Sequence, residues 1–450
     1  MNELNTPHSD SQTTRRDFLK KTSTAVVGGT LLGGLTIERA AHAAGSDLLK
    51  VALIGCGGRG SGAANQALNT YNCGPVKLVA MADAFRDQLD GSYNSLTKEQ
   101  KDRVDVPEEH KFVGFDAYKK AIGLADVVIL ATPPGFRPSH FEEAVRQGKH
   151  VFMEKPVATD APGVRRVLAA AEEAKKKGLK VGVGLQRHHQ LGYLETLSRL
   201  HDGAIGDLVA MRCYWNGTTP WVKPRAELEK KYGRKLTEME YQMRNWYYFV
   251  WICGDHIVEQ HIHNLDVINW VKNGYPVRAH GMGGCEVRKG PDYGEIFDHH
   301  AVEFEYADGS RCFSQCRHIN GCWSDVSEHV VGSKGKAYLS DGRWNISGGT
   351  TWQFRDKQER ERYQQEHDDL FNAIRQDKPY NEAENGAKSS LTAILGRMAT
   401  YCGKIVEWDA ALESKISYFP KNLAWDAEMG VKPGADGLYP HAVPGKTVVV

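Results

Sequence analysis

The sequence has almost no excess charge of either sign. It carries 57 lysine and arginine residues against 56 aspartate and glutamate residues, which gives a formal net charge of +1 at pH 7. Nucleic acids and anionic membrane surfaces are bound through clustered positive charge, so this balance argues against both partners. The chain also lacks low-complexity tracts and internal repeats, and 41% of its 450 residues are hydrophobic. We therefore expect two or three folded domains.

The nine cysteines contain no C-x-x-C pair. The three that lie closest together in the sequence are Cys312, Cys316 and Cys322. We predict that these are reduced residues of strands or loops, because their spacing matches no common metal or disulfide framework.

Long hydrophobic runs are also missing. The apolar run from Ala25 to Ile37 is interrupted by four glycines and is too short to be a membrane span. It follows Arg15-Arg16 and precedes the small residues Ala41-His42-Ala43. A disordered basic tail would explain the arginines but not this order of segments, which is typical of a Tat export signal. We predict that residues 1–45 are this signal and that the mature protein is periplasmic.

The first part of the mature chain alternates between apolar strands and helices. Helices are expected at about 60–69, 138–147 and 161–177. Such alternation predicts a parallel, doubly wound α/β sheet within residues 46–188. The expected strands are Leu48–Ile54, Val76–Ala82, Asp126–Ala131, His150–Met153 and Lys180–Gly184.

Residues 189–450 follow a different pattern. Strands without intervening helices indicate an antiparallel sheet, and two amphipathic helices, about 366–376 and 383–403, close the segment. We predict an α+β second domain. Its expected strands are Leu208–Trp215, Val277–Val287, His299–Tyr306, Arg311–Ile319 and Ser327–Gly332.

The segment Gly55-Cys56-Gly57-Gly58-Arg59-Gly60 fits the dinucleotide-binding pattern G-x-G-x-x-G. The first glycine permits a tight turn, the second lets the backbone approach a pyrophosphate, and the third lets strand and helix pack closely. Asp83 ends the next strand, where its carboxylate can bind the adenosine ribose and would repel a 2′-phosphate. We therefore expect NAD rather than NADP, although Arg86 offers a phosphate some compensation.

A charged pair, Glu154-Lys155, followed by Pro156, ends the strand His150–Met153. In open α/β sheets this edge faces the ligand crevice. A lysine there can hydrogen-bond a substrate hydroxyl and stabilise the oxyanion as it develops. Taken alone, a surface ion pair would be the simpler interpretation.

Together these segments resemble the Gfo/Idh/MocA family, which includes glucose–fructose oxidoreductase and inositol dehydrogenase. The resemblance rests on the glycine loop, Asp83, Ala131-Thr132-Pro133-Pro134 and Gly148–Pro156, and it extends from about Lys50 to Gly403. It implies a Rossmann domain followed by a large, mostly antiparallel open sheet, and it makes Lys155 the catalytic lysine. The cofactor contacts that it implies are Gly55, Gly57, Gly58, Arg59, Gly60, Asp83, Thr132, Pro133, Glu154, Lys155 and Gln186.

The family also has a helix with a catalytic histidine, usually four residues after an aspartate. The matching stretch is 254–266, in which His263 takes the place of the histidine and Glu259 that of the aspartate. The i,i+4 spacing puts both on one helix face. A histidine titrates near neutrality, which suits a general base. The role of Glu259 stays open, because glutamate is one methylene longer than the family's aspartate.

The same stretch offers an alternative. His256, Glu259 and His263, with His261 nearby, have a spacing that can ligate a metal. The family needs no metal for hydride transfer, so we expect none.

Substrate contacts are expected from two segments. Arg187 follows the strand that ends at Gly184, and aromatic and polar residues gather before the histidine stretch. Aromatic faces stack on sugar rings, and arginine or asparagine binds hydroxyls; an aromatic core or an oligomer contact is the alternative. The candidates are Arg187, Arg244, Asn245, Trp246 and His263.

We thus expect an NAD-dependent enzyme that oxidises a ring hydroxyl of a sugar, polyol or glycoside, with Lys155 polarising the hydroxyl and His263 taking its proton. The periplasm has no free nicotinamide pool, whereas the Tat route carries folded, cofactor-loaded proteins. Export therefore predicts a tightly held NAD whose hydride is returned within the reaction.

Two alternatives remain. A redox-neutral glycosidase would oxidise its sugar transiently to permit elimination of the glycosidic group. Relatives with that activity lack a lysine at the position of Lys155. A non-catalytic sugar-binding protein would need neither Lys155 nor His263. Family members commonly pack through the open sheet, so a homodimer or homotetramer is expected by resemblance.

Overall fold

The computed structural model describes residues 47–70, 73–355 and 361–450. The predicted export signal lies outside the described residues. Residues 47–450 form one compact unit. No helix in the described part of the chain has the length and apolar character needed to cross a bilayer. All nine cysteines lie within the described ranges, and no disulfide links any of them.

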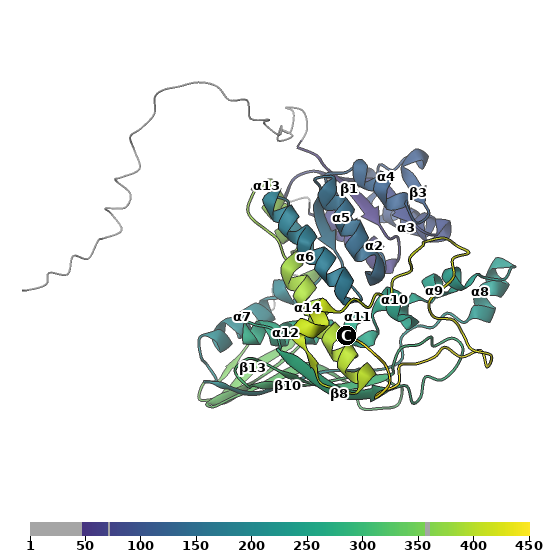
Figure 1. The fold of residues 1–450 in the computed structure, drawn as a ribbon. Coiled ribbons are helices and arrows are strands. Elements are labelled where there is room, and N and C mark those ends of the chain that lie inside the picture. Colours follow the sequence, from purple (N-terminus) through teal and green to yellow (C-terminus); the bar gives the residue numbers. More distant parts are fainter. Residues whose placement is uncertain (1–46, 71–72, 356–360) are drawn as a thin grey trace, which may run out of the picture. The chain divides into compact units, whose positions relative to one another are not determined.

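The first sheet has six parallel strands in the order β3-β2-β1-β4-β5-β6 (Figure 1). The four residues of β4 are fully buried, as expected for a central parallel strand covered on both faces. The predicted doubly wound α/β sheet is thus confirmed. Its strands are β1 (Leu49–Ile54), β2 (Val76–Asp83), β3 (Lys111–Val113), β4 (Val127–Leu130), β5 (His150–Met153) and β6 (Val181–Val183).

Side chains of β1 alternate between two apolar cores. Val51 and Leu53 pack with residues of α2, α3 and α13, whereas Ala52 and Ile54 pack with residues of α4, α5 and α6. Helix α13 comes from the C-terminal part of the chain, so the second domain completes one layer of the first. The bounds are α2 (Gly58–Leu68), α3 (Arg86–Gln100), α4 (Ala117–Gly123), α5 (Arg137–Arg146), α6 (Ala161–Lys176) and α13 (Arg362–Arg375).

The second sheet has nine strands in the order β14-β13-β12-β11-β7-β10-β9-β8-β15, all antiparallel except the pair β7 and β10. The predicted mostly antiparallel sheet is confirmed, but strands β12 to β15 were not expected. The strands are β7 (Leu208–Gly217), β8 (Arg278–Gly284), β9 (His299–Glu305), β10 (Arg311–His318), β11 (Asp325–Gly332), β12 (Gly335–Ser340), β13 (Arg343–Gly348), β14 (Trp352–Gln353) and β15 (Val406–Glu407).

One face of this second sheet is covered and the other is open. Along β10, Cys312, Ser314 and Cys316 are buried while Phe313 and Gln315 are exposed. Figure 1 shows the helices gathered on one side of the sheet. They are α7 (Leu191–His201), α8 (Arg225–Tyr232), α9 (Glu238–Arg244), α10 (Val250–Cys253), α11 (His256–Glu259), α12 (Ile262–Lys272), α14 (Ala383–Cys402) and α15 (Trp408–Glu413).

Candidate active site

The glycine loop connects β1 to α2. A Cβ on Gly55, whose φ is +95°, would lie 2.4 Å from the amide nitrogen of Thr132, and one on Gly60 would lie 1.9 Å from the carbonyl oxygen of Gly55. Both positions therefore require glycine. A Cβ on Gly57 or Gly58 would meet no atom within 4 Å, so this stretch of backbone faces open space at the start of α2. The loop thus fits a bound pyrophosphate.

Asp83 lies at the end of β2, directly beside this loop. Its Oδ2 accepts a hydrogen bond from the amide of Cys56 at 2.7 Å, and its Oδ1 accepts one from the amide of Phe85 at 2.8 Å. Burial raises the pKa of the Asp83 carboxyl. The carboxylate is therefore held in one orientation by the backbone on either side, which suits recognition of a ribose.

A single cavity of about 920 Å³ brings the predicted residues together. It is lined by the glycine loop and Asp83 from the first domain and by Glu259 and His263 from the second. Lys155 lies between them. Every predicted site residue lines this cavity except Asn245.

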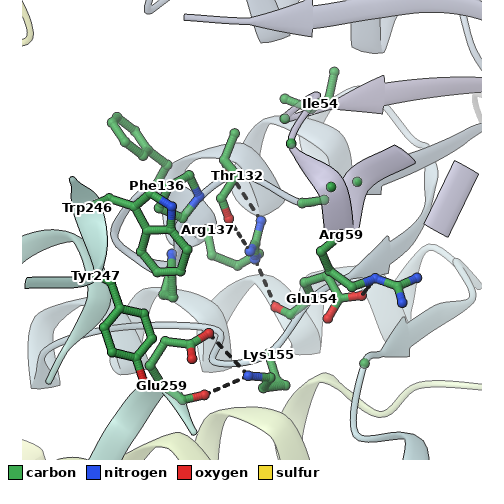
Figure 2. Close-up of a pocket in the computed structure, with 18 of the residues that line it drawn as sticks. Ile54, Arg59, Thr132, Phe136, Arg137, Glu154, Lys155, Trp246, Tyr247 and Glu259 are labelled. Atoms are coloured by element: carbon green, nitrogen blue, oxygen red, sulfur yellow. Dashed lines mark hydrogen bonds and ion pairs between the residues drawn. The ribbon is translucent and has the colours of Figure 1, made fainter. Parts of the chain in front are cut away.

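Lys155 follows β5 and reaches across to the second domain. Its Nζ donates to the carbonyl oxygen of Glu259 at 2.6 Å and to the carboxylate oxygen Oε1 at 3.2 Å (Figure 2). Burial raises the pKa of the Glu259 carboxyl, an effect that the Lys155 charge opposes. Glu259 therefore positions the lysine.

Glu259 and His263 do not share one continuous helix, contrary to the prediction. Helix α11 ends at Glu259 and α12 begins at Ile262, with Gln260 and His261 between them. Both side chains nevertheless line the cavity.

His263 is buried against the ring of Trp215, with the two ring centroids 5.8 Å apart and nearly parallel. Its Nδ1 has no hydrogen-bond partner among the described residues. Burial, followed by the charges of Lys155 and Arg187, holds the pKa of this imidazole well below its usual range. The ring is therefore neutral at pH 7 and able to accept a proton.

Two arginines that line the cavity hold the end of β5 in place. Arg59 Nε lies 2.9 Å from Glu154 Oε1. Arg137 Nε donates to the carbonyl oxygen of Glu154 at 3.0 Å, and its Nη1 donates to Thr132 Oγ1 at 3.2 Å. Figure 2 shows Arg137 between Thr132 and Glu154. Arg137 was not predicted, because a buried arginine in the first turn of a helix has no sequence signature.

Arg187 lines the cavity but its charge is neutralised. It forms a buried ion pair with Glu328 of β11. Glu328 also accepts a hydrogen bond from the hydroxyl of Tyr193 at 3.1 Å and one from the side-chain amide of Asn264. Arg187 is thus tied to the residue that follows His263.

The predicted substrate contacts 244–246 are separated by the structure. Arg244 stacks its guanidinium 3.9 Å from the ring of Phe85 and pairs with Asp87, so it lies at the Asp83 end of the cavity. Asn245 donates to the carbonyl oxygen of Asp292 at 2.8 Å. Its side chain therefore stabilises the backbone and does not line the cavity. Trp246 does line the cavity. The prediction for Asn245 failed because its amide satisfies backbone groups.

The metal alternative is not supported by the arrangement of its residues. Among the described residues, the group whose ligand atoms approach one another is Asp255, His256 and His300, within 4.8 Å. It does not include Glu259 or His263. Asp255 Oδ2 accepts hydrogen bonds from the amide of Phe297 and the hydroxyl of Tyr401, so this carboxylate is already engaged by the protein.

Several lining residues were not predicted from the sequence. Tyr247 has a buried hydroxyl without a partner in the described part of the chain, and it faces Glu259 in Figure 2. Arg362 and Tyr363 reach the cavity from α13, and Asp341 from the β12–β13 turn. Tyr247 belongs to the aromatic segment that the sequence indicated, but it was not itself among the predicted contacts.

Comparisons with known proteins agree with this geometry. Residues 49–184 match the Gfo/Idh/MocA family model, which is described as an oxidoreductase family with an NAD-binding Rossmann fold. The chain is 26% identical over 305 residues to inositol 2-dehydrogenase of Ralstonia nicotianae, covering 65% of this chain and 74% of the relative. It is 38% identical over 156 residues to inositol 2-dehydrogenase of Klebsiella pneumoniae, covering 34% of this chain and 37% of that relative.

Solved structures share the fold over 80% of this chain. Aldose–aldose oxidoreductase from Caulobacter crescentus superposes with a TM-score of 0.62 at 18% identity, covering 80% of this chain and 99% of that one. Levoglucosan dehydrogenase in complex with NADH and levoglucosan gives 0.63 at 14% identity, with coverages of 80% and 99%. These likenesses concern the fold. The match that concerns family is that of residues 49–184, which form an NAD-binding Rossmann domain of the Gfo/Idh/MocA oxidoreductase type.

Proposed function

We propose that the protein oxidises a hydroxyl group of a neutral sugar, polyol or glycoside, using a tightly bound NAD. The observation that carries this proposal is that Lys155 and His263 line the same cavity as the glycine loop. When bound there, the nicotinamide supplies a hydride acceptor. Inositol 2-dehydrogenase relatives, which are named for a cyclic polyol, support the substrate class.

Each catalytic group has a role that follows from its contacts. The Lys155 ammonium has three N–H donors. Two of them form hydrogen bonds with Glu259, so the third is available for a substrate hydroxyl. That hydrogen bond stabilises the developing oxyanion. His263, held neutral by burial, takes the hydroxyl proton. Trp215 keeps the imidazole plane fixed by stacking.

The charges of the cavity favour a neutral substrate. Four of the cations that line the cavity near Lys155 each have a carboxylate within ion-pair distance, so a substrate carboxylate would have to displace that partner. The pairs are Arg59 with Glu154, Lys155 with Glu259, Arg187 with Glu328 and Arg362 with Asp341. A fifth, Arg137, is buried and donates to the carbonyl oxygen of Glu154 and to Thr132.

The cofactor preference is NAD over NADP. Asp83 faces the ribose position with a fixed carboxylate. Arg86, which could have compensated the charge of a 2′-phosphate, is held by Asp90 at 2.9 Å and Glu108 at 2.5 Å.

We also propose export by the Tat pathway, on the strength of the order of segments in residues 1–45. Export is the reason to expect a NAD that stays bound.

The test uses the purified full chain loaded with NAD. Bound nicotinamide is monitored by its absorbance in single turnovers with myo-inositol, glucose, methyl glucosides, cellobiose and, as the acidic member, glucuronate. At least one neutral compound is expected to reduce the cofactor, and glucuronate is not. Failure of every neutral compound would count against the function, and reduction by glucuronate alone would overturn the neutral substrate class.

A second candidate, the redox-neutral glycosidase, is favoured by one observation. Glu259 Oε2 and the Tyr247 hydroxyl are buried polar atoms without partners among the described residues, and Tyr247 lines the cavity beside Glu259. A carboxyl whose pKa is raised by burial can deliver a proton to a leaving group. Release of nitrophenol from aryl glycosides without net NADH would support this candidate, and its absence would leave the dehydrogenase.

We further propose that the protein is a homodimer or homotetramer assembled through the open face of the second sheet. This face carries Met282 and Phe313, which are 78% and 45% exposed, and exposed apolar patches of this kind are common at protein interfaces. The measurement is the molar mass in solution. A monomer at micromolar concentration would contradict the proposal, and the variant Phe313→Glu is expected to shift an oligomer toward monomer.

A further inference from the structure

Residues 414–450 form one long segment, which we call the C-terminal strap. It contains no helix or strand. Its two ends meet, because Ser414 Oγ donates to the carbonyl oxygen of Val449 at 2.9 Å. In Figure 1 the strap is the yellow chain that leaves the second domain, runs toward the first domain and returns beside α9. The strap is therefore a closed loop that extends far from its base.

The first half of the strap is attached to the Rossmann domain. Asp160, the N-cap of α6, accepts hydrogen bonds through Oδ2 from Ser417 Oγ at 3.0 Å and from the amide of Tyr418 at 3.1 Å. Phe419 packs edge-on against Phe136, with ring centroids 5.4 Å apart. Phe136 lines the cavity, so the strap supports one of its walls from behind.

Trp425 of the strap supports the adenosine end of the same wall. Its ring centroid lies 5.2 Å from that of Phe85 and 4.6 Å from that of Phe115. Both phenylalanines line the cavity next to Asp83. The guanidinium of Arg244 packs on Phe85 at 3.9 Å from the second domain. Phe85 is therefore in contact with the strap and with the opposite wall at once.

The second half of the strap is attached to the second domain. Gln242 Nε2 donates to the carbonyl oxygen of Val431 at 2.8 Å, and Arg225 Nη2 donates to the hydroxyl of Tyr439 at 3.1 Å. His441 Nδ1 donates to the carbonyl oxygen of Glu295 at 2.9 Å. The strap thus joins both walls of the cavity, in addition to the direct contact of Arg244 with Asp87 of α3.

We propose that the strap converts the dinucleotide into a non-exchanging prosthetic group, with Trp425 as the positioning residue that keeps the adenosine end closed. The inference rests on the proposed binding of NAD in this cavity. Arg244 of the second domain reaches across the adenosine end of the cavity to Phe85 and Asp87, so release of a dinucleotide from this end requires the two walls to separate. Separation requires the strap to release one wall, so its contacts add to the barrier for dissociation while contributing nothing to hydride transfer.

The test compares the rate at which bound NAD is released from the full-length protein. Protein loaded with radiolabelled NAD is desalted and then incubated with excess unlabelled NAD, and retained label is followed over time. Trp425→Ala is expected to release NAD about ten-fold faster or more, the effect of losing about 1.4 kcal/mol of contact. The matched control is Trp352→Ala, because Trp352 is half-buried like Trp425 but contacts Phe354 and Arg199 at the edge of the second sheet and does not line the cavity.

A second variant addresses the other wall. Tyr439→Phe keeps the ring that packs on Phe249 at 5.0 Å and removes the hydroxyl that accepts from Arg225. The hydroxyl also donates to Glu238, so two hydrogen bonds are lost. Release is expected to accelerate by about five-fold or more, with a melting temperature close to that of the wild type.

The outcomes separate the inference from the proposed function. A wild-type protein that exchanges NAD within seconds would overturn the inference, as would variants that release NAD at the wild-type rate. A lower melting temperature of Trp425→Ala with unchanged release would mean that the strap is only structural. A wild-type protein that binds no NAD at all would overturn the proposed function itself.

Discussion

The ammonium nitrogen of Lys155 lies 2.6 Å from the main-chain oxygen of Glu259 and 3.2 Å from its carboxylate. The lysine belongs to the Rossmann domain and the glutamate to the second domain, so the contact aligns the two halves of the site. Because a main-chain oxygen is one of the acceptors, no side-chain substitution at position 259 removes the contact completely.

Lys155→Met is expected to retain NAD and to lose turnover. Methionine preserves the stem but removes the donor to the substrate oxyanion, so the rate of bound-cofactor reduction should fall by about 10² or more. The measurement is single-turnover reduction with the best sugar or polyol, alongside NAD content. Lys336→Met, at an exposed position on β12, is the control. Loss of NAD together with turnover would point to a structural role.

As the pH is lowered, the activity of the wild type is expected to fall only below the pKa of an ordinary histidine. Burial lowers the pKa of His263 well below 6.5, so the neutral base persists as the pH falls through 6. Activity should therefore stay level between about pH 6 and 8. His263→Asn should remove this fall in activity and lower the rate by about 10². A wild-type fall centred near pH 7 would contradict the assignment.

Glu328→Gln is expected to destabilise the fold. The substitution leaves Arg187 buried without a counter-charge, which costs about 3 kcal/mol of the free energy of unfolding. Urea denaturation measures the loss. The double variant Arg187→Met/Glu328→Gln should recover much of it, because no unpaired charge then remains. Equal stability of the wild type and Glu328→Gln would show that the pair contributes little.

His189 should make the free energy of unfolding depend on pH under alkaline conditions. Burial lowers its pKa, but contacts with Asp369 at 2.7 Å and Glu382 at 3.2 Å outweigh this and raise the pKa to about 10. Since the folded pKa exceeds the unfolded value, the stabilisation is complete below about pH 6.5 and is lost as the pH rises through 10. The free energy of unfolding should fall over this range less steeply in His189→Gln than in the wild type.

The sequence predicted the parts of the site that depend on local spacing. The glycine loop, Asp83 and Lys155 each lie at the carboxyl end of a buried parallel strand, where short-range pattern and function coincide. The same reasoning predicted both sheets, because apolar strands with or without intervening helices can be recognised in the sequence. It also placed His263 in the cavity, although through a helix that the structure divides at Gln260.

What the sequence could not predict depends on distant contacts. Arg244 was expected beside the substrate, yet Phe85 and Asp87 draw it to the adenosine end. Trp425 lies in a segment without periodicity, so no pattern indicated its contact with Phe115. Strands β12 to β14 were missed because short strands rich in glycine and polar residues resemble turns.

The hydrogen bond from the amide of Cys56 to Asp83 has a consequence for cofactor engineering. In the proposed function, the carboxylate that supports this turn also recognises the ribose, so the two tasks cannot be altered separately. Replacing Asp83 by alanine to admit NADP would also release the turn. Asn or Ser, which can still accept from the Cys56 amide, are the replacements with which a redesign should begin.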